Sequence, residues 1–229
     1  MAKDKQKVQL TRQKKIAKQK AKAKAARQHQ MNQGVPFEHR FGVSRADTQR
    51  APVFGAWVSE TIFENGMGTV IIARELDNGS IAAGIFLVDA WCLGVKNAFF
   101  RPFAPSDFEE MLAYTHNREP LEEQSPEYAA KLIGDVVDFS RKLGFSPHAD
   151  YGDATSVLAG IDRSLCDENF IFGKDGKPFY IAGPHDTPFR AQQICAQLAS
   201  ICGEGNYHFM LPVGQPGEDF GDFLEEELP

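Results

Sequence analysis

The chain has 229 residues, of which 42% are hydrophobic and eighteen are Phe, a content that excludes a wholly disordered chain and favours a globular body. Residues 1–33 hold eleven Lys or Arg and one acid, a net +10, which leaves 14 basic and 30 acidic residues, a net −16, for the rest. No stretch approaches the roughly 18 uninterrupted apolar residues of a membrane span, and no apolar secretory signal opens the chain. We therefore expect a cytoplasmic protein without a membrane span.

The composition predicts four regions. Residues 1–33 form a basic low-complexity tail that is rich in helix formers but has little to bury, so we expect it to be disordered or a frayed helix. Residues 34–50 read as a linker or arm. Residues 51–212 are long enough for one globular domain with a sizeable core, and residues 213–229 form an acidic tail.

The globular region opens with three apolar runs, at residues 53–60, 68–75 and 80–95. They predict a β-meander of three strands, the last of them central in the sheet because it is long and apolar. Between the second and third runs, Asn78-Gly79 is typical of a type I′ hairpin turn, in which both turn residues have positive φ.

Two helices are expected next. Ser106 and Glu109 have the spacing of a capping box, which predicts a helix to about Thr115. Ser125 as N-cap with Pro126 at the first position predicts a second helix, which a strong apolar stripe carries as far as Gly144.

The remaining elements are a hairpin, a helix and a strand. Residues 170–172 and 178–181 flank Gly173-Lys174-Asp175-Gly176 and predict a second hairpin. Thr187 and Pro188 open a third helix that ends at Gly203, and residues 206–211 form a final strand. This order of elements indicates an α+β fold rather than a doubly wound sheet.

The sequence predicts neither a metal site nor a cofactor. Cys92, Cys166, Cys195 and Cys202 show no CxxC spacing, so we expect reduced thiols. Cys195 and Cys202 fall on the apolar stripe of the third helix and are interpreted as core residues.

Asp89 is a candidate site residue because it lies within or at the end of a hydrophobic strand. A buried carboxylate is costly unless it is paired, and such positions often carry metal or general-base chemistry. The competing interpretation is that Asp89 caps the strand end or pairs with Lys96 or Arg101.

His148, Asp150 and Asp153 lie in one loop after the second helix and are candidates for a metal site or an acid–base pair. The ordinary role of such Asp side chains is turn chemistry, which is the favoured interpretation. His185 and Asp186 precede the third helix, whose start can hold an anion, although Thr187 as a plain cap also accounts for the segment. His208 lies on the final strand as a candidate ligand or a structural histidine.

The basic tail offers contacts to phosphates. Its few aromatic residues argue against base stacking, so any RNA binding is expected to be mainly electrostatic. The expected contacts are Arg12, Lys14, Lys15, Lys18, Lys20, Lys22, Lys24 and Arg27. At the other end, residues 213–229 interleave acids with Phe220, Phe223 and Leu224 and are a possible protein-binding segment, or a partner for the basic tail.

Four segments, GIFLVDAWCLGVKNAFFR, LGFSPH, GKPFYIAGP and GEGNYHF, resemble a bacterial protein family of unassigned function. The resemblance covers residues 51–211 and leaves out both charged tails. It implies one compact domain in a bacterial cytosol, and no site residue follows from it.

The sequence thus favours a non-enzymatic RNA- or ribosome-associated protein anchored by its Lys-rich tail. One alternative is a metal-dependent hydrolase whose site lies in the globular body. Another is an acidic protein-interaction or immunity-type module.

Overall fold

The computed structural model describes residues 35–183 and 186–211 and divides the chain into two compact units at Asp47 and Thr48. In the first unit, helix α2 (Phe37–Phe41) ends at Gly42, which has a left-handed φ of 71°. The Arg45 guanidinium lies 4.4 Å above the Phe37 ring, and the Arg45 amide donates to Glu38. Helix α3 (Arg45–Arg50) follows, so the stretch read as a linker is largely helical.

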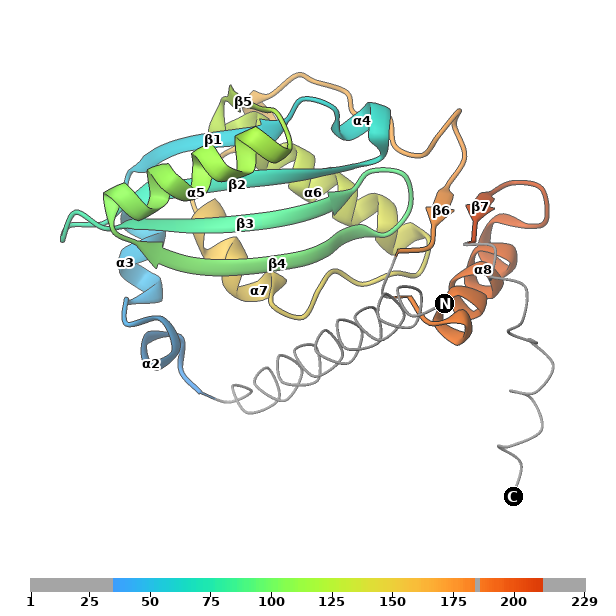
Figure 1. The fold of residues 1–229 in the computed structure, drawn as a ribbon, viewed down its shortest axis with the longest axis horizontal. Helices are drawn as coiled ribbons and strands as arrows, with labels where there is room; N and C mark the ends of the chain where they lie inside the picture. The colour runs from blue at the N-terminus through green and yellow to red at the C-terminus, as the bar shows by residue number, and fades with distance from the viewer. Residues whose placement is uncertain (1–34, 184–185, 212–229) are drawn as a thin grey trace, which may run out of the picture. The chain divides into compact units, whose positions relative to one another are not determined.

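A five-stranded antiparallel sheet forms the centre of the second unit (Figure 1). The strands follow the order β4-β3-β2-β1-β5 across the sheet. A short helix, α4 (Ile62–Asn65), connects β1 to β2. The strand bounds are β1 Val53–Ser59, β2 Met67–Glu75, β3 Ile81–Asp89, β4 Gly94–Phe103 and β5 Leu121–Gln124. Ile71 pairs with Trp57 on one side and with Ile85 on the other, which places the apolar side chains of neighbouring strands in register.

The predicted meander is present but has four strands rather than three, because the third apolar run covers β3, a turn and the first two residues of β4. Residues 90–93 form a turn between β3 and β4, and Asp89 pairs with Gly94 across it. Gly94 has φ 70°, and a Cβ there would lie 2.3 Å from Ser140 Oγ, so glycine is required where helix α6 approaches the sheet. The β5 strand was not predicted.

The β2–β3 hairpin is present, but its turn is not type I′. Gly79 has φ 77°, whereas Asn78 has no positive φ. The Gly79 amide donates to Leu76 O and the Leu76 amide donates to Ser80 O, which makes a longer loop with one left-handed residue. Asn78 instead accepts hydrogen bonds from the Ser80 amide and hydroxyl.

Helix α5 (Pro105–Arg118) covers one face of the sheet (Figure 1). Phe108 is 1% exposed and packs among Ile71, Ile85 and Phe103. The predicted capping box does not form: the helix begins at Pro105 with Ala104 as its N-cap, and no side chain caps it. Proline at the first helical position supplies the start signal instead, because its missing N–H needs no partner there.

Helix α6 (Pro126–Lys142) and helix α7 (Tyr151–Ala154) lie on the opposite face of the sheet (Figure 1). The predicted start of α6 is confirmed, since Ser125 Oγ accepts a hydrogen bond from the Tyr128 amide. A 3₁₀ turn, η1 (Thr155–Leu158), packs closely on β3. A Cβ at Gly84 would lie 2.7 Å from both Ala154 O and Val157 Cγ2, so this face admits the η1 segment only because residue 84 is glycine.

Arg74 on β2 is 4% exposed and ties two segments, residues 49–51 and 157–159, to the sheet. Its Nε donates to Val157 O at 2.7 Å and one terminal nitrogen donates to Gln49 O at 3.3 Å. The terminal nitrogens also donate to Ala51 O and Ala159 O. Burial lowers the pKa of this guanidinium, which nonetheless stays charged at neutral pH.

The C-terminal part packs helix α8 (Pro188–Cys202) against a two-stranded parallel sheet of β6 (Phe179–Ile181) and β7 (His208–Met210). Thr187 Oγ1 accepts from the Arg190 amide, which confirms the predicted cap of α8. Tyr180, Ile194 and Leu198 form its core with Cys92. Cys195 and Cys202 are partly buried and pack against this cluster, in agreement with their predicted core role.

The predicted hairpin around Gly173-Lys174-Asp175-Gly176 was wrong in its pairing. Only an isolated bridge, Lys174 to Lys177, forms there, and β6 pairs with β7. Phe170 and Phe172 leave strand geometry because they insert between other rings: Phe170 stacks on Phe63 at 5.7 Å and Phe172 stacks on Phe139 at 5.3 Å.

The second unit therefore confirms an α+β fold. Across residues 35–183 and 186–211, no helix has the length and apolarity that a membrane crossing requires.

Candidate functional site

Asp89 is 4% exposed at the end of β3, and its carboxylate holds the turn that follows. Oδ1 accepts the Trp91 amide at 3.1 Å and the Cys92 amide at 2.9 Å. Burial raises the pKa of this carboxyl to about 6, while the Lys96 ammonium and the turn amides oppose that rise. The strand-end interpretation of Asp89 is the one that the hydrogen bonds support.

His148 and Asp150 meet in the turn before α7. The Asp150 amide donates to His148 Nδ1 at 3.2 Å, and Nδ1 lies 3.8 Å from Asp150 Oδ2. Asp153 lies one turn along α7, where its amide donates to Asp150 O at 3.2 Å. These contacts are those of a local turn.

Asp186 anchors the loop before α8. Oδ2 accepts the Tyr180 hydroxyl at 3.0 Å and the Gly183 amide at 2.8 Å, and Oδ1 pairs with Arg190 Nε at 3.4 Å. Burial, and then the bond to Asp186, raise the pKa of the Tyr180 phenol. Asp186 is thus a structural acceptor of a buried hydroxyl.

His208 is exposed on β7, with its ring edge-on to Phe179 at 6.2 Å. The predicted candidates therefore occupy separate places: the β3–β4 turn, the start of α7, the loop before α8 and strand β7. Within the described ranges, no group of three or more His, Cys, Asp or Glu is arranged to hold a metal ion.

Some candidates lie outside the described residues. They are His185 and the basic-tail residues Arg12, Lys14, Lys15, Lys18, Lys20, Lys22, Lys24 and Arg27. The acidic segment 213–229 also lies there.

A polar groove of about 410 Å³ runs between α6 and the loop that crosses it. Helix α6 contributes Lys131 and Asp135 to its lining. The loop contributes Arg163, at the start of the 3₁₀ turn η2 (Arg163–Leu165), and then Ser164, Cys166, Asp167 and Asn169. The groove thus carries two cations and two acids.

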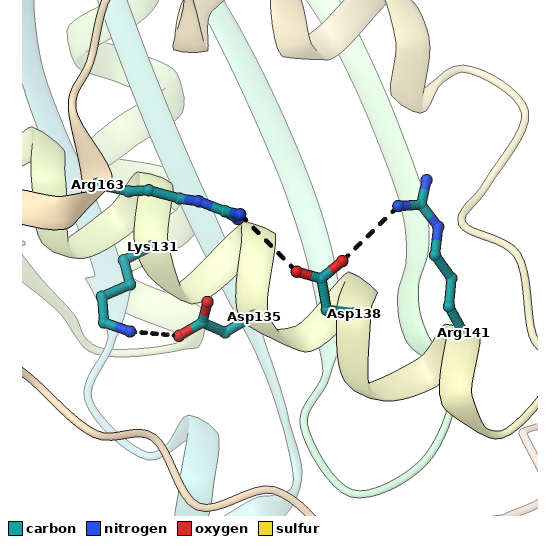
Figure 2. A network of polar contacts seen from close by, with 5 residues as sticks. All are labelled: Lys131, Asp135, Asp138, Arg141 and Arg163. Atoms are coloured by element: carbon teal, nitrogen blue, oxygen red, sulfur yellow. Dashed lines mark hydrogen bonds and ion pairs between the residues drawn. The ribbon is translucent and has the colours of Figure 1, made fainter.

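The charges along this face of α6 form two separate sets of ion pairs (Figure 2). Lys131 Nζ lies 2.6 Å from Asp135 Oδ2. Asp138 lies between two arginines, 3.8 Å from both Arg141 and Arg163. In Figure 2, Arg163 reaches across the helix from the loop, whereas Arg141 extends from α6 itself.

Gly134 lets Arg163 lie across α6. A Cβ at residue 134 would be 1.9 Å from a terminal nitrogen of Arg163. Glycine inside a helix costs about 1 kcal/mol relative to alanine. The Arg163–Asp138 pair has half-exposed side chains 3.8 Å apart, a class of contact that contributes about 0–1 kcal/mol.

The ion pair of Arg163 with Asp138 therefore contributes little to stability. The sequence interpretation missed this groove. The signal available was Gly134 itself, an isolated glycine in the middle of the strongest amphipathic helix.

Comparison of the chain with protein-family models, with curated proteins and with solved structures gave no match.

Proposed function

We propose that this protein is a non-enzymatic RNA- or ribosome-associated protein that is anchored by its Lys-rich segment 1–33. The observation that carries the proposal is the division of charge, +10 in this segment against −16 in the rest. A segment of clustered Lys side chains offers positive charge but no shaped binding surface. Such segments bind phosphate polymers, of which RNA is one. The rest of the chain is negatively charged, as RNA is, and the two repel each other. The binding is therefore assigned to residues 1–33 alone.

Two alternatives have less support. A metal-dependent hydrolase would draw on Asp89, His148, Asp150, His185 or His208, and among those that the structure describes the printed contacts join His148 to Asp150 alone. An acidic interaction module would use the negative body, but it leaves the basic segment without a role.

The test is co-sedimentation of the full chain with ribosomes and with purified RNA between about 50 and 200 mM salt. Eight neutralised contacts predict that log affinity falls against log salt with a slope near −6 for single-stranded RNA. A variant with Gln at all eight of Arg12, Lys14, Lys15, Lys18, Lys20, Lys22, Lys24 and Arg27 is expected to stay in the supernatant.

The matched control replaces the six Lys of that set by Arg, which keeps the charge and is expected to keep the binding. If the Gln variant sediments as the native chain does, the basic segment is not the anchor. Capture of a basic protein by the Gln variant would instead support the interaction-module alternative.

A further inference from the structure

We propose that the groove between α6 and residues 163–169 binds a small zwitterionic molecule, with a carboxylate held by Arg163 and an ammonium held by Asp167. The proposal concerns the second unit alone and does not rest on RNA binding.

The first argument is the placement of Arg163. A guanidinium has five N–H donors, yet the contact that fixes this one is a 3.8 Å pair with Asp138, and its side chain is 53% exposed. Gly134 clears the space that the guanidinium occupies. Arg163 thus lines the groove with a half-exposed guanidinium whose one long ion pair leaves most of its donors for a ligand carboxylate.

The second argument is the balance of charge. Lys131 and Asp135 largely neutralise each other at 2.6 Å. Asp167 has no ion-pair partner among the residues that the structure describes, so it and Arg163 are the lining charges open to a ligand. A simple anion would be repelled by Asp167 and a simple cation by Arg163. A molecule that carries both charges can place its carboxylate at Arg163 and its ammonium at Asp167.

The third argument is size and polarity. A groove of about 410 Å³ falls within the roughly 300–1,000 Å³ of small-molecule clefts. Its lining is polar and open to solvent, so the affinity is expected to be modest, and the amide of Asn169 can add a hydrogen bond.

The experiment measures binding of L-glutamine to the full chain by calorimetry and by ligand-observed NMR. Acetate and methylammonium serve as probes with one charge each. We expect L-glutamine to bind at least about tenfold more tightly than either, with a Kd on the order of millimolar or below. Arg163→Gln is expected to weaken L-glutamine about tenfold or more.

Arg141→Gln is the matched control, because Arg141 pairs with the same Asp138 at the same 3.8 Å and is similarly exposed, but does not line the groove. It is expected to leave binding unchanged within about twofold. Gly134→Ala is expected to weaken binding as Arg163→Gln does, since the added methyl displaces the guanidinium while the helix retains its fold.

Three results would overturn the proposal. The first is no L-glutamine binding at about 10 mM, tenfold above a millimolar Kd. The second is equal binding of acetate, which would make the groove a plain anion site. The third is equal loss in the Arg141 and Arg163 variants. None of these results affects sedimentation with RNA. The ligand site in the groove and RNA binding by residues 1–33 are therefore tested independently.

Discussion

Replacing Arg74 by Met is expected to lower the free energy of unfolding by about 3–5 kcal/mol. Met keeps much of the length of the side chain but donates no hydrogen bond. The buried bonds to the carbonyls of Ala51 and Val157, and the partly buried bond to Ala159, would then be lost. Each buried acceptor left without a partner costs about 1–3 kcal/mol. Urea denaturation followed by circular dichroism measures the difference.

Arg101→Met is the control, since Arg101 is exposed on β4 and lies over the Phe103 ring at 4.8 Å. We expect it to cost less than about 1 kcal/mol. Arg74→Lys should fall in between, because one ammonium cannot reach the carbonyls of both segments at once. A loss below about 1 kcal/mol in Arg74→Met would show that these bonds do not hold the fold.

Asp89 is expected to make stability fall as pH rises. Its pKa is raised to about 6 in the folded chain, against an ordinary value near 3.8. The folded state therefore favours the protonated carboxyl, and this contribution is complete below pH 3.8 and lost as pH passes through 6. Between pH 4 and 7, the free energy of unfolding of the native chain should fall by about 2–3 kcal/mol relative to that of Asp89→Asn.

The measurement is the unfolding free energy of both chains at several pH values, read as the change in their difference. A constant offset is expected, because Asn retains an acceptor for the Trp91 and Cys92 amides but loses the second carboxylate oxygen. Asp77→Asn, in the exposed β2–β3 turn, supplies the baseline for an ordinary surface acid. Parallel curves for the native chain and Asp89→Asn would contradict the raised pKa.

The sequence predicted those elements whose signals are local. The starts of α6 and α8 were found because Ser125 and Thr187 cap the residues that immediately follow them. The β2–β3 hairpin was found because glycine and asparagine favour a turn. In each case, the residues that determine the structure lie within four positions of one another.

Features that depend on distant residues were missed. Trp91 and Cys92 read as a continuing strand, but the turn is held by residues far along the chain: the Trp91 indole donates to Phe63 O and the Phe179 amide donates to Trp91 O. Phe170 and Phe172 alternate like strand residues, but they pack with rings from α4 and α6. The groove has the same cause, since Arg163 follows Gly134 by 29 positions and no periodicity joins them.

The two tryptophans stand in different apolar clusters, which bears on how the second unit melts. Trp57 packs beneath α5, whereas Trp91 stacks on Phe179 of β6 at 5.5 Å, next to the cluster that holds α8. Chains with Trp57→Phe or Trp91→Phe each keep one fluorescent reporter. One shared midpoint would mean cooperative unfolding, and an earlier midpoint at Trp91 would make β6, β7 and α8 a separate foldon.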